Sequence, residues 1–264
     1  MSRIENRGTA IVTGASSGLG AVYAERLAGQ GYDLLLVARR ADRLEALAET
    51  IRSKHGRSVS TFAADLGDDA DLRRLEDRIA GDGNITLLVN NAGIGGQKVV
   101  AEADAEGIAQ QIKVNVVALT RLTRAVLPGL IRKGKGAVVN LASILAFNTV
   151  FGGIYSGTKA YVVNFTEGLQ SELEGTGVKA QVVLPGPIKT EFWDIAGGDI
   201  SVLPPEIIMT AEDLVDSALA GLEHGEDFTA PGLADLGDVQ KFRQARDAFY
   251  GKLVAGKPAA RYAA

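Results

Sequence analysis

The chain has 264 residues, of which 46% are hydrophobic and 23% charged, and its formal net charge is −4. These proportions are typical of a globular protein and exclude a disordered chain, a coiled coil and a fibrous repeat. The acidic balance predicts neither a nucleic acid nor a membrane as a partner, since both attract basic surfaces. A sequence without cysteine has no disulfide, no thiolate metal site and no cysteine nucleophile. Residues 1–8 lack the apolar stretch of a signal peptide, so we expect a cytoplasmic protein.

Short apolar runs alternate along the chain with longer segments of helical periodicity. Most of the short runs are apolar throughout, which is typical of parallel strands buried on both faces. We predict strands at Thr9–Thr13, Asp33–Ala38, Val59–Ala64, Thr86–Asn90, Ala137–Ala142 and Lys179–Leu184, and helices at Leu19–Ala28, Ala41–Lys54, Asp71–Ala80, Ala105–Lys133 and Tyr155–Glu174. The repeated β-α order predicts an α/β fold with a doubly wound parallel sheet of the Rossmann type.

The C-terminal part of the sequence is less regular. Further helices are predicted at Ala211–Glu223 and Val239–Leu253, and a short last strand at Asp227–Ala230. No break in composition marks a second domain, so we expect one domain over residues 1–264, with a frayed tail at 256–264.

The turn after the first predicted strand is rich in glycine, and residues 13–20 read Thr-Gly-Ala-Ser-Ser-Gly-Leu-Gly. Such a turn lets the backbone approach a phosphate, and the amides and positive dipole of the following helix attract it. The spacing differs from the common Gly-x-Gly-x-x-Gly fingerprint, and no Lys-Ser or Lys-Thr follows as in a P-loop. A helix start that binds nothing is the alternative, but the position after the first strand favours a dinucleotide pyrophosphate. The expected contacts come from Gly14, Ser16, Ser17, Gly18, Leu19 and Gly20.

The second predicted strand ends in Ala38-Arg39-Arg40, which bears on the kind of dinucleotide that binds. Sites for NAD place an acidic residue there to accept a hydrogen bond from the ribose 2′-hydroxyl, and this sequence has none. The forked guanidinium of Arg39 suits a 2′-phosphate by charge and by geometry. The alternative is that both arginines are solvated loop residues. We therefore predict NADP rather than NAD as the cofactor, with Arg39 as the contact to its 2′-phosphate.

Tyr155 and Lys159 lie four residues apart at the start of a predicted helix and share one of its faces. A phenol has a pKa of about 10, and a nearby ammonium lowers that pKa by stabilising the phenolate, which makes proton transfer feasible. Ser143 follows the fifth predicted strand, at the edge where open α/β sheets bind ligands. Taken singly, each of these residues has an ordinary structural explanation. Their joint placement predicts a site for proton transfer to a carbonyl oxygen.

With these motifs in this order, the sequence resembles the short-chain dehydrogenase/reductase family over residues 8–190. The resemblance implies that Asp65 and Leu66 hold the adenine, and that Asn91 and Gly93, in the motif Asn-Asn-Ala-Gly, lie near the cofactor. It implies that the segment after the sixth strand orients the nicotinamide, with Pro185, Gly186, Ile188 and Thr190. The catalytic tetrad of the family corresponds to Asn115, Ser143, Tyr155 and Lys159.

The activity that the resemblance implies is hydride transfer between the nicotinamide of NADPH and a carbonyl or secondary alcohol. Tyr155 is expected to transfer the proton, Ser143 to orient and polarise the carbonyl, and Lys159 to lower the pKa of Tyr155 and bond the nicotinamide ribose. Asn115 is expected to hold a water that links Lys159 to solvent. One alternative is a dinucleotide-sensing protein without turnover, which would be expected to lack the Tyr-x3-Lys pair. Another is an epimerase or dehydratase, but enzymes of that kind have longer chains with an added substrate domain, which a chain of this length does not readily accommodate.

The family also implies a substrate lid, expected at residues 190–210, and the sequence there is apolar, with Phe192, Trp193 and Ile195 before a glycine pair. A small-molecule substrate with hydrophobic bulk is one interpretation, and packing of these side chains on the sheet is the other. The helices at 105–133 and 155–174 correspond to subunit contacts of the family, which implies a homodimer or homotetramer. His55 and His224 have no partner at metal-ligand spacing, so no metal is expected.

Overall fold

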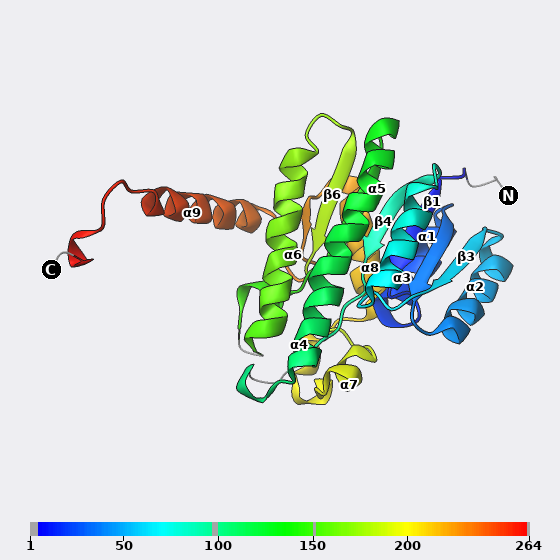
Figure 1. Cartoon of the computed structure of the whole chain (residues 1–264), viewed down its shortest axis with the longest axis horizontal. Coiled ribbons are helices and arrows are strands. Elements are labelled where there is room, and N and C mark those ends of the chain that lie inside the picture. Colours follow the sequence, from blue (N-terminus) through cyan, green and yellow to red (C-terminus); the bar gives the residue numbers. More distant parts are fainter. Residues whose placement is uncertain (1–4, 97–99, 150–151, 263–264) are drawn as a thin grey trace. The chain divides into compact units, whose positions relative to one another are not determined.

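The computed structural model of the chain describes residues 5–96, 100–149 and 152–262. Its strands are β1 (Thr9–Thr13), β2 (Asp33–Ala38), β3 (Val59–Ala63), β4 (Ile85–Asn90), β5 (Gly136–Leu141), β6 (Val178–Val183) and β7 (Phe228–Thr229). They form one parallel sheet in the order β3-β2-β1-β4-β5-β6-β7 (Figure 1), which confirms the predicted doubly wound Rossmann-type fold. β1 and β2 have the predicted bounds, and the other strands differ from the prediction by no more than one residue at either end.

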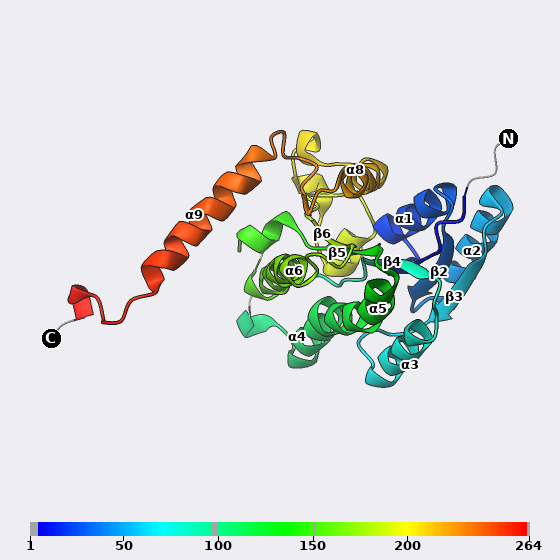
Figure 2. The same ribbon diagram turned by 90° about the horizontal axis from the view of Figure 1, so that it is seen from above.

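Helices cover both faces of the sheet, as the view in Figure 2 shows. One face carries α1 (Gly18–Gly29), α2 (Ala41–His55) and α8 (Ala211–His224), and the other carries α3 (Asp69–Ala80), α4 (Ala105–Ile112), α5 (Leu119–Lys133) and α6 (Gly153–Glu172). Each face has its own apolar core, with Tyr23 and Leu44 buried on the first and Leu72 and Leu122 on the second. Because the strands are buried from both sides, their sequences are apolar throughout rather than alternating.

The order of the strands determines where a ligand can bind. β1 pairs with β2 on one side and with β4 on the other, so the sheet grows in opposite directions from β1. At such a switch point the loops that follow the two central strands separate and leave a crevice at the carboxyl edge of the sheet. The glycine-rich turn after β1 and the Asn-Asn-Ala-Gly segment after β4 therefore face the same crevice.

The helix predicted at 105–133 is interrupted in the structure. α4 ends at Ile112, a π-helical turn follows at Lys113–Ala118, and α5 begins at Leu119. A π turn adds one residue to a helical turn and is frequent at functional sites. Among the described residues, 105–133 is the helical stretch long and apolar enough to cross a membrane. It packs on the sheet through Leu122, Val126 and Leu130, as a core helix does.

The chain divides into two compact units, residues 1–231 and 232–264. The first unit contains the whole sheet and its covering helices. The second contains α9 (Gly237–Leu253), which bears exposed apolar side chains: Phe249, Tyr250 and Leu253 are 61%, 67% and 63% exposed. The doubly wound domain thus lies in the first unit, and α9 follows it as a helical unit that composition alone did not distinguish.

Candidate active site

The β1–α1 loop has positions that favour glycine. Gly14 and Gly18 have φ values of +66° and +54°, in the left-handed region that side chains disfavour. A Cβ on Gly20 would lie 2.3 Å from the carbonyl oxygen of Gly14, so the first turn of α1 packs directly on the loop backbone. Ser17 is the N-cap residue of α1, but its side chain makes no capping hydrogen bond. The helix N-terminus therefore offers amide groups to an anion.

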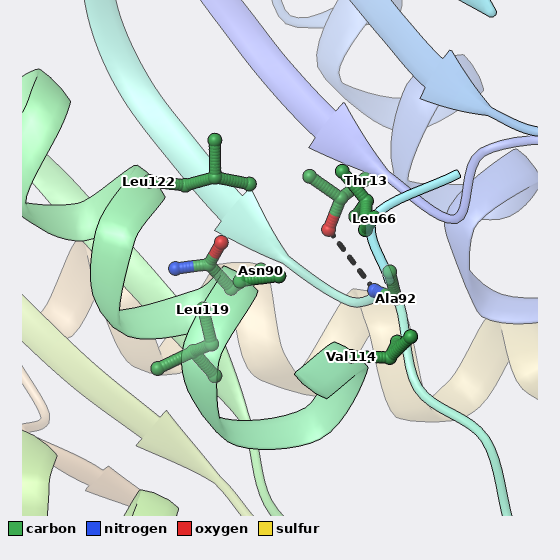
Figure 3. A pocket seen from close by; sticks show the side chains of 8 residues that line it. Thr13, Leu66, Asn90, Ala92, Val114, Leu119 and Leu122 are labelled. Atoms are coloured by element: carbon green, nitrogen blue, oxygen red, sulfur yellow. Dashed lines mark hydrogen bonds between the residues drawn. The ribbon is translucent and has the colours of Figure 1, made fainter. Parts of the chain in front are cut away.

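Thr13 and Asn91 tie the loop after β1 to the loop after β4. The Oγ1 atom of Thr13 accepts hydrogen bonds from the amides of Asn91 and Ala92, each at 3.0 Å, and Figure 3 shows the bond to Ala92. The Nδ2 atom of Asn91 donates to the carbonyl oxygens of Thr13 and Gly14 at 2.8 and 3.3 Å. These bonds hold the two predicted cofactor loops beside each other at the switch point.

Beneath these loops lies a small void between the ends of the central strands and α5, and it leaves no room for a water molecule (Figure 3). Its lining is mostly apolar, and it includes Leu66, which is buried in the core. The void is a packing gap and does not hold a ligand. The predicted adenine contact of Leu66 can therefore come from its backbone but not from its buried side chain.

Asn115 lies in the π-helical turn and is buried. Its Oδ1 atom accepts from the amide of Ile94 at 2.9 Å, and its Nδ2 atom donates to the carbonyl oxygen of Ile94 at 2.9 Å and to Oγ1 of Thr158 at 3.1 Å. A Cβ on Gly93 would lie 3.4 Å from Oδ1 of Asn115 and 3.6 Å from Nζ of Lys159. The structure thus brings together Gly93, Asn115 and Lys159, which the sequence separates by up to 66 positions.

Lys159 projects from α6 into the protein interior. It is 5% exposed, and its Nζ atom donates to the carbonyl oxygen of Leu141, at the end of β5, at 2.8 Å. Burial disfavours the ammonium and lowers the pKa of Lys159 to about 8. The side chain can therefore exchange its proton close to neutral pH, which an exposed lysine cannot do.

The hydroxyl of Ser143 lies close enough to the hydroxyl of Tyr155 to lower the pKa of the phenol. Ser143 is the N-cap residue of a 3₁₀ turn at Ile144–Phe147, and its Oγ atom accepts from the amide of Leu145 at 3.1 Å, which fixes its position. On another side of the phenol lies Phe192, the first residue of α7 (Phe192–Ala196), with a distance of 6.0 Å between the ring centroids.

The pKa of Tyr155 differs from the expectation. Burial raises this pKa to about 12, and the nearby hydroxyl of Ser143 offsets only part of the increase. The Nζ atom of Lys159 lies 5.7 Å from the centre of the Tyr155 ring and is engaged by the carbonyl oxygen of Leu141. At this distance, an ammonium whose own pKa is lowered by burial does not compensate for the desolvation of the phenol. The net pKa of the phenol therefore lies above its usual value, and the lowering expected from Lys159 stays a prediction.

The arginine that contacts the glycine-rich loop is Arg40. Its guanidinium donates to Oγ of Ser16 at 3.2 Å and to Oγ of Ser17 at 2.8 Å, whereas Arg39 is exposed. Arg40 is the N-cap residue of α2, so its side chain leaves the chain where the helix begins beside the loop. The sequence identified the arginine pair but gave no signal of which member turns toward the serines.

A second group of residues was not found by sequence reasoning. The carboxylate of Glu191 forms ion pairs with Arg40 at 3.4 Å and with Arg43 at 3.0 Å. Glu191 is the N-cap residue of α7, whereas both arginines lie at the start of α2. Arg43 and Arg40 lie 148 and 151 residues from Glu191 in the sequence, so only the fold brings these charges together.

The segment after β6 connects several predicted site residues. The carbonyl oxygen of Pro185 accepts from the amide of Ile144 at 3.0 Å, and Gly186 lies beside the side chain of Ile144. Ile188 is buried and pairs with Met209 in an isolated bridge. The side chain of Thr190 lies 3.4 Å from the place where Gly18 would carry a Cβ. The predicted nicotinamide segment therefore extends from the Ser143 region to the glycine-rich loop.

Asp65 lies in the loop after β3 and accepts hydrogen bonds from the amide of Gly67 at 2.9 Å and from Nε2 of Gln110 at 3.3 Å. A Cβ on Gly67 would lie 2.0 Å from Nε2 of Gln110. These contacts hold the loop after β3 close to α4.

Comparisons with known proteins place this geometry in a family. Residues 8–197 match the family model for short chain dehydrogenases. The serine 3-dehydrogenase of Agrobacterium fabrum is 38% identical over 188 residues, which are 70% of this chain and 74% of that protein. A short-chain dehydrogenase from Sphingobium yanoikuyae, solved in complex with NADPH, is 41% identical with a TM-score of 0.92, and the match covers 97% of this chain and 100% of the other.

A bulky-bulky ketone specific alcohol dehydrogenase from Comamonas testosteroni is 34% identical with a TM-score of 0.90, over 98% of this chain and 100% of that chain. The doubly wound sheet and these matches define an oxidoreductase of the Rossmann type. The chain belongs to the short-chain dehydrogenase family.

Proposed function

We propose that the chain is an NADP(H)-dependent oxidoreductase that interconverts a ketone and a secondary alcohol, with Ser143, Tyr155 and Lys159 as catalytic residues and Asn115 as the fourth member of the tetrad. One observation carries the proposal: Tyr155, the buried Lys159 and Ser143 at the end of β5 meet at the sheet edge that holds the glycine-rich loop. Hydride transfer to a carbonyl needs a proton donor beside a dinucleotide cradle.

The loops fit a bound NADP molecule. The absence of a Cβ at Gly20 lets the backbone of α1 approach the loop, and the uncapped helix N-terminus suits a pyrophosphate. Arg40, with Arg39 beside it, suits a 2′-phosphate, and β2 ends without an acid that would favour NAD. Bound there, NADPH would supply the hydride. The structures from Sphingobium yanoikuyae and of L-sorbose reductase from Gluconobacter frateurii, both complexed with NADPH, support this choice.

Each tetrad side chain has a role that its contacts support. Tyr155, with a pKa of about 12, stays protonated at neutral pH and donates its proton to the carbonyl oxygen. Ser143, close to the hydroxyl of Tyr155, orients the same oxygen. Lys159, while protonated, favours the phenolate that remains when the proton leaves. Asn115 positions Lys159 through its hydrogen bond to Thr158. The side-chain amide of Asn115 also donates to the carbonyl oxygen of Ile94 and so fixes the loop after β4.

Apolar side chains near Tyr155 favour a ketone with bulky hydrophobic groups. Ile144 and Phe147, in the 3₁₀ turn after Ser143, are 45% and 49% exposed, and Ile195 on α7 is 62% exposed. The first two follow Ser143 and the third follows Phe192, which contacts Tyr155, and exposed apolar side chains are typical of surfaces that bind apolar partners. The relative from Comamonas testosteroni is named for bulky ketones, which supports the same substrate class.

A homodimer or homotetramer is part of this proposal. Ile112, Val117 and Ile131, on the helical stretch 105–133, are 42%, 37% and 45% exposed. The buried core of a homodimer interface is more apolar than the rest of a protein surface. Sedimentation of the purified chain at several concentrations tests this assembly.

The test of the function is NADPH oxidation with a panel of ketones, from acetone to ketones with two bulky groups. We expect turnover to be highest with the bulky members. Tyr155→Phe is expected to lower kcat by about 10²- to 10⁴-fold, because it removes the proton donor, and to leave the Kd of NADPH within about twofold. Retained turnover in this variant would contradict the role of Tyr155. Tight NADPH binding by the unaltered chain without turnover of any ketone would favour the dinucleotide-sensing alternative.

A further inference from the structure

Glu191 links the cofactor side of the crevice to its substrate side. Its carboxylate accepts hydrogen bonds from Arg43 at 3.0 Å and from Arg40 at 3.4 Å, and Arg40 also donates to Ser16 and Ser17 of the glycine-rich loop. The guanidiniums of Arg43 and Arg40 hold the pKa of Glu191 below its usual range. Both arginines are thus neutralised by an anion that belongs to the chain itself.

The same glutamate sets the position of a helix beside the phenol. Glu191 is the N-cap residue of α7, and the next residue, Phe192, packs against the ring of Tyr155. Phe192 also lies close to Gly95, where a Cβ would come within 2.6 Å of the phenylalanine ring. α7 has only five residues, so a displacement of Glu191 carries Phe192 with it.

We propose that Glu191 competes with the 2′-phosphate of NADPH for Arg40 and Arg43, which makes it a specificity-determining residue that couples recognition of NADP to the uncovering of Tyr155. The inference rests on the proposed function. A phosphate carries more negative charge than a carboxylate and is matched by the forked donors of guanidinium groups. NADH presents only a hydroxyl at this place, which cannot replace the carboxylate. Therefore only NADPH displaces Glu191 from the two arginines. When Glu191 moves, Phe192 moves with it and no longer covers the ring of Tyr155.

The sequence provides a built-in probe of this movement. Trp193 is the single tryptophan of the chain, lies in α7, and donates from Nε1 to the carbonyl oxygen of Ile188 at 2.9 Å. Adenosine 2′,5′-bisphosphate carries the 2′-phosphate without a nicotinamide, so it reaches the arginines without touching the site of Tyr155 and without absorbing the emission of Trp193. We expect this ligand to shift the emission, and adenosine 5′-monophosphate, which lacks the 2′-phosphate, to leave it unchanged.

Glu191→Gln removes the competing charge and keeps the size of the side chain. We expect the Trp193 emission of the unliganded variant to match that of the natural chain bound to adenosine 2′,5′-bisphosphate. Titration of the variant with this ligand should cause no further shift. By calorimetry it should bind the bisphosphate about three- to tenfold tighter, as the loss of partly exposed ion pairs implies. Its Kd for the monophosphate should change less than about twofold.

Asp194→Asn is the matched control. It makes the same change of charge in α7, at an exposed residue that no described side-chain hydrogen bond or ion pair joins to an arginine. We expect it to behave as the natural chain. If the bisphosphate binds without a shift of Trp193 emission, or if Glu191→Gln responds like Asp194→Asn, the coupling is refuted while the preference for NADP stands. If the bisphosphate does not bind the natural chain, the preference for NADP and the coupling are refuted together.

Discussion

At the scale of single residues, the buried Lys159 controls how the proposed activity depends on pH. Its pKa of about 8 means that the ammonium is present at pH 7 and lost as the pH rises through 8. Tyr155, with a pKa of about 12, keeps its proton over the whole of that range. We therefore expect kcat/KM for ketone reduction to be constant below about pH 7 and to fall above about pH 8, because the charge that stabilises the phenolate disappears.

The measurement is kcat/KM at saturating NADPH from pH 6 to 10, with the Kd of NADPH determined separately at each pH as the control. A profile that stays level from pH 7 to 9.5 would contradict the role of Lys159.

Burial of Lys159 also has a cost in stability. Because the pKa is lowered from 10.5 to about 8, folding disfavours the charged form, fully below pH 8 and progressively less as the pH rises toward 10.5. The shift in pKa corresponds to a cost of about 3 kcal/mol in the free energy of folding. Replacing Lys159 removes this cost but also removes the hydrogen bond to Leu141, which is worth about 1 kcal/mol. We expect the free energy of unfolding of Lys159→Met to exceed that of the natural chain by about 2 kcal/mol at pH 7 and by less at pH 9.5. Urea denaturation at both pH values tests this, and a Met variant less stable at pH 7 would disprove it.

A residue of the site could be predicted from the sequence when its contacts are local in the chain, and could not when they join distant segments. Tyr155 and Lys159 were predictable because their spacing of four is a local property of a helix. The choice of Arg40 over Arg39 was not, since it depends on where α2 begins relative to the glycine-rich loop. The raised pKa of Tyr155 was missed for a similar reason: burial comes from Phe192 and other distant parts of the chain, which no local pattern shows.

At the scale of elements, the β1–α1 turn can be tested with a matched pair of glycines. A Cβ on Gly20 would lie 2.3 Å from a backbone oxygen, whereas Gly168 in α6 is exposed and has nothing within 4 Å of its Cβ position. We expect Gly20→Ala to destabilise the chain by about 2 kcal/mol and to weaken NADPH binding. Gly168→Ala should instead stabilise α6 by about 0.5–1 kcal/mol. Thermal unfolding and NADPH titration measure both effects, and equal behaviour of the two variants would refute the close approach at Gly20.

Strands and helices were largely predictable because buried parallel strands leave apolar runs that end at turn residues, as at Asp33–Ala38. The π-helical turn at Lys113–Ala118 was not, because one extra residue hardly changes the spacing of apolar positions around it. Asn115 lies in that turn. The sequence therefore identified the residue but not the π-helical backbone that orients its side chain toward Ile94.

At the scale of the whole molecule, the alternation of strands and helices sufficed to predict the parallel sheet and the edge at which its loops meet. The handedness of β-α-β crossovers leaves few other arrangements for this order of elements. The unit at 232–264 was not separated by the sequence, since its helix α9 has an ordinary composition and periodicity. What distinguishes it is how few of its side chains are buried, which depends on contacts rather than on residue types.

That unit has a consequence for how copies of the protein respond to salt. Residues 232–264 contain six basic and three acidic side chains, so the remaining residues are more acidic than the net charge of −4 indicates. Attraction between such opposite regions of neighbouring molecules fades as ions screen it. Adhesion through Phe249, Tyr250 and Leu253 instead grows as salting-out ions drive apolar surfaces together. We therefore expect solubility to be highest at intermediate ionic strength and to fall in both dilute buffer and concentrated sulfate.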